Sequence, residues 1–352
     1  MRQRKATKDG QIGRGAMREI AEHAGVSIAT VSRVLNNRPD VSAATRSSVL
    51  RLVRESGYVS SRVARASWET GLIALSVPAF RQGPATEVVA GAMAAIRDHN
   101  ARLVLCGGDD GADPDASSRA RLLEGMTDGA LLVLPNESPA EIGALLQGSF
   151  PFVAIDPVVP LPESVPVVAS ANWAGAKNAA EYLIGLGHTH IGLITGPGHW
   201  CATADRRAGY QAALLAAGLP LVPGVVRETD GGIEGAARAA DQLLASPHVP
   251  TAIFALSDGM ALGVLRAARE RGLAVPQDLS VVGFDDLEMA SIVTPTLTSV
   301  RQPFQGLGRV GVETLFRLLQ GQPLHARRVE LSTTLVLRES TGPPHPISFL
   351  TF

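Results

Sequence analysis

The chain has 352 residues, 45% hydrophobic and 18% charged, which is ordinary for globular proteins and long enough for two or three compact units. No apolar run approaches the roughly 18 residues that a membrane-spanning helix needs, and the basic N-terminus lacks the apolar core of a signal peptide. Cys106 and Cys201 lie far apart and match no metal-binding spacing. These features predict a protein of the reducing cytoplasm, without a disulfide framework or membrane contact.

Charge is distributed unevenly along the chain. Residues 1–67 contain 13 Lys and Arg against 5 Asp and Glu, whereas the other residues contain 19 against 28. A basic head on an acidic body suits a nucleic-acid-binding protein, because the head attracts phosphates and the body does not. A solvated basic tail would give part of the same excess, so charge alone leaves both interpretations open.

The spacing of apolar residues predicts three short helices in the head. The first covers residues 17–24, and Gly25 is suited to the left-handed position that ends a helix. Ser27 can cap the second helix, and Ser42 can cap the third. Two short helices joined by a tight turn and braced by a third form the helix-turn-helix arrangement.

Two stretches of the head carry a specific resemblance. They are EIAEHAGVSIATVSRVLNN (Glu19–Asn37) and VSAATRSSVLRLVRESGY (Val41–Tyr58), and they closely resemble the head of the LacI/GalR family of repressors. The resemblance implies that the second helix lies in the major groove of DNA, where Ile28 and Ala29 choose the operator sequence. Arg33, one turn further on, can donate two hydrogen bonds to a guanine edge, although a phosphate contact is the alternative.

The resemblance implies further DNA contacts around this helix. Ser27 and Thr30 are expected to hold phosphates, which position the head without selecting sequence. The complete expected set is Ser27, Ile28, Ala29, Thr30, Arg33, Asn36, Arg62 and Arg65.

Residues 59–70 correspond to the family's hinge, which becomes helical on DNA and inserts a leucine from each subunit into the minor groove. Here Ser67 stands at the leucine position, and its small polar side chain cannot fill an opened base step. Trp68 either takes over the wedge or packs against the body, and both alternatives stay open. Arg62 and Arg65 remain as phosphate or minor-groove contacts.

From Gly71 onward, short apolar strands alternate with amphipathic helices, which predicts parallel sheets covered on both faces. The expected strands are 72–77, 102–106, 129–134, 152–155, 191–195, 252–255 and 279–284. The expected helices are 86–100, 117–125, 139–146, 174–186, 204–217, 233–245, 259–271 and 304–319. One sheet would hold too many strands, so two lobes are expected, with ligands in the cleft beyond the carboxyl ends of the strands.

The body also resembles the LacI/GalR family. The matching stretches are YLIGLGHTHIGLITG (Tyr182–Gly196), DRRAGYQAAL (Asp205–Leu214), FALSDGMALGVLRAARERGLAVPQDLSVVGFDD (Phe254–Asp286) and PTLTSVRQP (Pro295–Pro303). The resemblance implies an α/β fold class, with an all-α helix-turn-helix head and two doubly wound parallel-sheet lobes like those of periplasmic binding proteins.

The resemblance also implies a division of the chain. The expected parts are a basic tail (1–15), the helix-turn-helix domain (16–58), the hinge (59–70), an effector-binding and dimerisation domain (71–340) and a second tail (341–352). Within the large domain, the N-lobe is expected at 71–157 and 300–330 and the C-lobe at 158–299 and 331–340.

Five residues are candidate effector contacts. Asp258 follows a strand and opens a helix, so its carboxylate either accepts sugar hydroxyls or caps the helix. Arg206 matches the family's effector-contacting arginine, with a structural ion pair as the alternative. Trp200 can stack on a sugar ring or fill its own loop. Asp156 and Asp230 match pocket-lining positions less closely.

The identity of the effector has one sequence cue. Pro84 and Ala85 stand where the family often has aromatic residues, which favours a polar, sugar-like effector over a flat purine.

The function expected from these features is that of a transcriptional repressor. It binds a palindromic operator in double-stranded DNA as a homodimer, and a small effector between the lobes, a sugar or sugar derivative, controls it. The helix at 304–319 and the N-lobe surface are expected to supply the dimer contact, and the cytoplasm, at the nucleoid, is the expected location.

Two other functional classes are disfavoured. No dinucleotide fingerprint, P-loop or Ser-His-Asp arrangement is complete, so no catalytic residue, metal or cofactor is expected. A free solute-binding protein would share the two lobes, but it would have no DNA-binding head.

Overall fold

The structure is a computed structural model. It describes residues 20–35, 70–77, 83–107, 126–135, 137–222 and 224–344, together with positions 42, 45, 48, 49 and 52. The following expected features lie outside the described residues: the N-terminal tail, Asn36, the hinge residues Arg62, Arg65, Ser67 and Trp68, the helix at 117–125, and most of the C-terminal tail.

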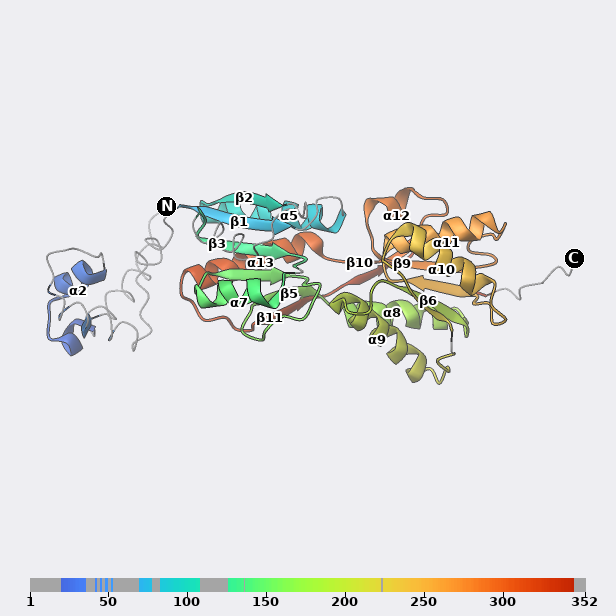
Figure 1. Ribbon diagram of the computed structural model, residues 1–352, viewed down its shortest axis with the longest axis horizontal. Helices are drawn as coiled ribbons and strands as arrows, with labels where there is room; N and C mark the ends of the chain where they lie inside the picture. The colour runs from blue at the N-terminus through green and yellow to red at the C-terminus, as the bar shows by residue number, and fades with distance from the viewer. Residues whose placement is uncertain are drawn as a thin grey trace, which may run out of the picture.

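Two six-stranded sheets form the body, one in each lobe, and the lobes lie side by side along the long axis of the molecule (Figure 1). The N-lobe sheet has the order β11-β5-β4-β3-β1-β2. Its strands are β1 (Leu72–Val77), β2 (Arg102–Gly107), β3 (Gly129–Val133), β4 (Phe152–Ile155), β5 (Val167–Ser170) and β11 (Arg328–Leu331).

The C-lobe sheet has the order β12-β10-β9-β8-β6-β7. Its strands are β6 (Ile191–Thr195), β7 (Val226–Glu228), β8 (Ala252–Ala255), β9 (Ser280–Asp285), β10 (Thr298–Arg301) and β12 (Thr334–Val336). Every pairing in both sheets is parallel except that of β10 with β12. This is the expected α/β fold of two doubly wound lobes.

Helices cover both faces of each sheet, which explains why inner strands such as β3 and β8 are apolar and buried along their whole length. The N-lobe has α5 (Gly83–Ile96) packed against α13 (Phe304–Leu319) on one face and α7 (Pro139–Gln147) on the other. The C-lobe has the pairs α8 (Asn172–Gly185) with α9 (Cys201–Ala216) and α10 (Ile233–Leu244) with α11 (Asp258–Glu270), and the short α12 (Glu288–Ile292).

Glycines allow the paired helices to approach closely. A Cβ atom on Gly308 of α13 would lie 2.1 Å from the carbonyl oxygen of Val88 in α5. A Cβ atom on Gly209 of α9 would lie 2.2 Å from the carbonyl oxygen of Trp173 in α8. Because any larger residue would collide with backbone, these two glycines fix the spacing of the helix pairs.

The chain passes between the lobes three times. It leaves the N-lobe after β5, returns between β10 and α13, and leaves again between β11 and β12. The sequence predicts the first passage at residue 157–158, whereas the structure has it at Ala171, because β5 pairs with β4 and β11. This strand has only four residues and follows a proline-rich segment, so its sequence does not distinguish it from a loop.

Among the described helices, none is long and apolar enough to cross a membrane.

Candidate functional site

The described part of the head has a small buried core. Ile20, Ala21, Val31, Val34 and Val49 are buried together, and the last three come from the second and third expected helices. The second helix is α2 (Ile28–Leu35). Burial of Val31 and Val34 on one face of α2 turns its other faces outward.

The turn before α2 is built as its sequence suggests. Gly25 has a φ of +65°, which a residue with a side chain rarely adopts. The Ser27 hydroxyl accepts a hydrogen bond from the Thr30 backbone N–H at 3.1 Å, and Ser42 does the same for Thr45 at 3.2 Å. Each serine therefore accepts a hydrogen bond from a backbone N–H three residues further on, as a capping residue does.

The outward faces of α2 carry the residues expected to contact DNA. Ile28 is 44% exposed, Ala29 and Arg33 are also exposed, and Thr30 is half-buried. An exposed isoleucine at the first turn of a short helix is available to another molecule. Of the expected DNA-contacting set, Ser27, Ile28, Ala29, Thr30 and Arg33 lie within the described residues.

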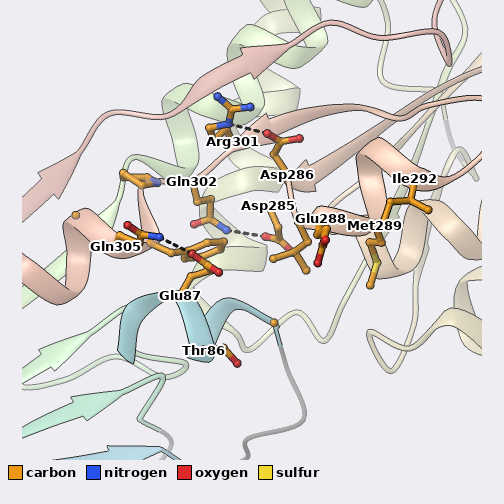
Figure 2. A pocket seen from close by; sticks show the side chains of 15 residues that line it. Thr86, Glu87, Asp285, Asp286, Glu288, Met289, Ile292, Arg301, Gln302 and Gln305 are labelled. Atoms are coloured by element: carbon orange, nitrogen blue, oxygen red, sulfur yellow. Dashed lines mark hydrogen bonds and ion pairs between the residues drawn. The ribbon is translucent and has the colours of Figure 1, made fainter. Parts of the chain in front are cut away.

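A cavity of about 800 Å³ lies between the lobes (Figure 2). The first turns of α5 and α13 form its N-lobe wall. The end of β9, the helix α12 and the passage at residues 301–303 form its C-lobe wall. The cavity therefore lies beyond the carboxyl ends of strands, where a doubly wound fold binds its ligands.

Asp285, the last residue of β9, connects the cavity to a buried charge cluster. Its Oδ1 accepts a hydrogen bond from Gln302 Nε2 at 2.6 Å and lies 3.6 Å from Nη1 of Arg206. The side chain lines the cavity although the residue is only 8% exposed. Burial raises the pKa of Asp285 to about 6, while Arg206 and Gln302 oppose the shift.

Arg206 lies behind the cavity and does not line it. Its Nε donates to Asn172 Oδ1 at 2.7 Å, and its Nη1 donates to the Leu256 carbonyl at 2.6 Å. The guanidinium carbon lies 3.7 Å from the centre of the Phe284 ring. Of the two alternatives for Arg206, the structure contains the ion pair, and its partner is Asp285, at the base of the cavity.

Asp258 differs from the expectation that its carboxylate is open to a ligand. The residue is fully buried, its Oδ2 accepts from the Leu287 N–H at 2.7 Å, and its Oδ1 accepts from Ser299 Oγ at 2.5 Å. Its side chain does not cap α11 either, because Ser257 Oγ accepts from the Met260 N–H. Burial first, and the Asp285 carboxylate second, raise the pKa of Asp258 to about 7.

Trp200 and Asp230 lie in loops that follow strands of the C-lobe. The half-buried Trp200 ring rests on the backbones of Gly196 and Gly231, where a Cβ atom would be 3.4 Å from it. Asp230 is exposed, and its Oδ1 accepts from the Gly232 N–H at 3.0 Å. Neither residue lines the cavity.

Asp156 lies at the end of β4 in the N-lobe. Its carboxylate accepts from the backbone N–H of Ser170 at 3.0 Å and from its hydroxyl at 3.3 Å. Burial raises the pKa of Asp156, and the charge of Arg206 lowers it. The N-lobe therefore contributes one carboxylate to the cluster around Arg206.

The sequence interpretation missed several side chains that line the cavity. They are Glu87, Asp285, Asp286, Glu288, Arg301, Gln302 and Gln305. Asp258 was chosen because it follows an apolar strand. Asp285 and Asp286 stand at the end of another apolar strand, so the same sequence signal could have identified them. Asp286 forms ion pairs with Arg301 and Arg338, both at 2.6 Å.

The sequence matches known families over both parts of the chain. Residues 16–61 match the model for bacterial regulatory proteins, lacI family, and residues 180–341 match the periplasmic binding protein-like domain. The chain is 33% identical to the ribose operon repressor of Halalkalibacterium halodurans over 330 residues. This match covers 92% of this chain and 96% of that protein. The chain belongs to the lacI family.

Solved structures of LacI-family proteins share its fold. The transcriptional regulator CelR in its complex with cellobiose has a TM-score of 0.71 and 33% identity, over 92% of this chain and 99% of that one. The lac repressor dimer bound to operator and the anti-inducer ONPF has a TM-score of 0.68 and 30% identity, over 92% and 98%. This LacI-family protein is therefore a DNA-binding transcriptional repressor and not an enzyme.

Proposed function

We propose that this LacI-family protein binds a palindromic operator as a homodimer, and that a sugar-like effector between its lobes controls the affinity for DNA. The exposed face of α2 carries the first half of the proposal. Ile28 and Ala29 in its first turn and Arg33 one turn further on contact bases, while Ser27 and Thr30 hold phosphates. Asn36, Arg62 and Arg65 add contacts to the backbone or the minor groove.

The interlobe cavity supports the second half of the proposal. Two of its lining residues, Arg301 and Gln302, belong to a passage between the lobes. A ligand in the cavity therefore acts directly on the angle between the two lobes. Closure then changes the distance between the two heads of the dimer, which couples the effector to the operator.

The residues expected from the sequence keep a place in the proposal, although none of them lines this cavity. Arg206, Asp258 and Asp156 form a charged layer behind it, and Trp200 and Asp230 belong to C-lobe loops that would reach an effector only when the lobes close. The proposal keeps the division into a helix-turn-helix domain (16–58), a hinge (59–70) and an effector-binding domain (71–340). It also places the protein at the nucleoid, where a regulator of chromosomal genes acts.

The homodimer contact is assigned to α5 and β2. The helix at 304–319 (α13), which was expected to supply this contact, buries apolar side chains such as Leu307 and Leu315 within the N-lobe, so only the N-lobe surface is kept from that expectation. Met93 on α5 and Leu105 on the edge strand β2 are each 50% exposed, and apolar groups exposed to this degree suit a contact with a second copy. Replacing both by Glu is expected to yield monomers in analytical ultracentrifugation.

DNA recognition is tested by gel retardation on a set of palindromic operators. Arg33→Ala should cost about 1–3 kcal/mol on the preferred operator and relax the choice of base at one position. Replacing Ile28 and Ala29 together should change which palindrome is preferred and leave non-specific affinity nearly intact. If Arg33→Ala weakens all sequences equally, Arg33 is a phosphate contact and the assignment to a base is wrong.

A further inference from the structure

Two carboxylates that face the cavity have spare capacity to accept hydrogen bonds. Glu87 extends from α5 in the N-lobe, and Glu288 extends from α12 in the C-lobe (Figure 2). Both residues are exposed, and Gln305 Nε2 donates one hydrogen bond to Glu87 Oε2 at 2.8 Å. An ionised carboxylate has several acceptor sites, so each of these glutamates can still accept hydrogen bonds from a ligand.

The positive charge of the described cavity lining is held in an ion pair. Among the described residues that line it, Arg301 is the only cation, against the carboxylates of Glu87, Asp285, Asp286 and Glu288. The Nε of Arg301 donates to Asp286 Oδ2 at 2.6 Å. An anionic ligand would have to compete with this ion pair while it approached three other carboxylates.

Gln302 supplies a second, independent observation. The residue is only 6% exposed, and its Nε2 donates to Asp285 Oδ1, which fixes the orientation of the amide. Its Oε1 is buried and has no hydrogen-bond partner among the described residues. A buried acceptor without a donor costs free energy, so a ligand that donates a hydrogen bond to Oε1 removes this cost.

We propose that the cavity selects a ligand rich in hydrogen-bond donors and free of negative charge, namely a neutral or amine-bearing polyol. It rejects the phosphate esters and acids of the same sugars. A ligand in the cavity touches its walls, well within the Debye length of about 8 Å in physiological salt, so the charges on the walls act on it with little salt screening. The inference rests on the proposed effector function of this cleft.

The same charges bear on closure of the lobes. Glu87 and Glu288 belong to different lobes, so their carboxylates repel each other as the lobes approach. A donor-rich ligand between them offsets this repulsion, and a cationic group offsets it most. An anionic ligand adds to the repulsion and opposes closure.

The test uses the full chain and matched sets of sugars. The neutral probes are ribose, glucose and cellobiose; the amine is glucosamine; the anions are ribose 5-phosphate, glucose 6-phosphate and glucuronate. Binding is measured by isothermal titration calorimetry, and operator release by fluorescence anisotropy. A neutral or amine-bearing probe should bind at least about tenfold more tightly than its anionic counterpart.

The outcomes separate this inference from the proposed function. If an anionic probe binds as tightly as its parent sugar, or is the probe that changes operator affinity, the charge selection is refuted and the effector function stands. If no probe of any class binds or changes operator affinity, the proposed function fails and the inference fails with it.

Charge variants test the assignment to residues. Glu87→Gln and Glu288→Gln keep the shape of the wall and should each reduce the discrimination against anionic probes by about three- to tenfold. Glu163→Gln is the matched control, because Glu163 is exposed and does not line the cavity. Unchanged discrimination in both cavity variants would refute the assignment.

Discussion

The two walls of the cleft differ in how far their polar groups are already satisfied. On the C-lobe wall and behind it, Arg206, Asp258 and Asp285 are buried. Their hydrogen bonds connect α9 to the segment after β8, α11 to the segment after β9, and β9 to the passage after β10. On the N-lobe wall, Thr86 and Glu87 are exposed in the first turns of α5. The comparison indicates that the C-lobe wall is preformed, whereas the N-lobe wall acquires its contacts when the lobes approach.

The largest effect is expected when the preformed wall loses its central cation. Arg206→Ala leaves Asp285 and Asp156 buried without their nearest positive charge, which should cost about 3–5 kcal/mol of unfolding free energy and abolish the effector response. Urea unfolding and effector titration measure the two losses. Arg207→Ala is the matched control, because Arg207 is exposed on the same helix and should change stability by less than about 0.5 kcal/mol.

Asp258 distinguishes support of the wall from contact with the effector. Asp258→Ala removes the acceptor of the Leu287 N–H and of the Ser299 hydroxyl, and it should destabilise the protein by about 1–3 kcal/mol. Thermal unfolding measures this loss. A variant with unchanged stability and lost effector affinity would contradict the supporting role and make Asp258 a ligand contact.

These two residues also show what the sequence reveals and what it does not. A carboxylate after an apolar strand was predictable at both Asp258 and Asp285, since both follow strands of a parallel sheet. Which of the two reaches the cavity depends on tertiary packing, because Ser299 and Leu287 come from distant segments and occupy both oxygens of Asp258. Sequence spacing contains no information on such long-range partners.

The fold was predictable where elements were long or fully buried. All seven expected strands are present, each within one residue of its expected ends, as in β1 and β8. The strands β5, β7, β10, β11 and β12 were not expected. Each has only three or four residues, and all five lie at a sheet edge or next to a passage between the lobes.

A graded effect, on the order of 1 kcal/mol per pH unit between pH 5 and pH 7, is expected from the titration of Asp258 and Asp285 in the preformed wall. The pKa values of Asp258 and Asp285 are raised to about 7 and about 6, so the native state binds protons that the unfolded state has released. The contribution of this pair is therefore present at pH 5 and is lost as pH rises toward 7, below the limit of about 1.4 kcal/mol per pH unit for one proton.

Unfolding measured at several pH values tests this sign. Asp258→Asn cannot release the proton, so the stability of wild type relative to this variant should decline as pH rises from 5 to 7. A difference that grows over this interval would show that the pKa of the pair is depressed instead.

The smallest effect is expected on the N-lobe wall, at Gly83 in the first turn of α5. A Cβ atom there would lie 3.3 Å from both methyl carbons of Leu287, which belongs to the C-lobe wall. Leu287 is only half-buried and can rotate by the few tenths of an ångström required. Gly83→Ala should therefore change the free energy of unfolding by less than about 0.5 kcal/mol and lower the affinity for the effector by less than about threefold.

Calorimetric titration with the sugar probe that binds most tightly to the wild-type protein measures the change in affinity. Gly143→Ala is the matched control, because Gly143 lies in α7 and a Cβ atom there would meet nothing within 4 Å. The contact between Gly83 and Leu287 joins the lobes, so only Gly83→Ala should change effector affinity. A loss of tenfold or more in Gly83→Ala would mean that the N-lobe wall is as rigid as the C-lobe wall, because an adjustable wall absorbs one methyl group. The contrast between the two walls would then be refuted.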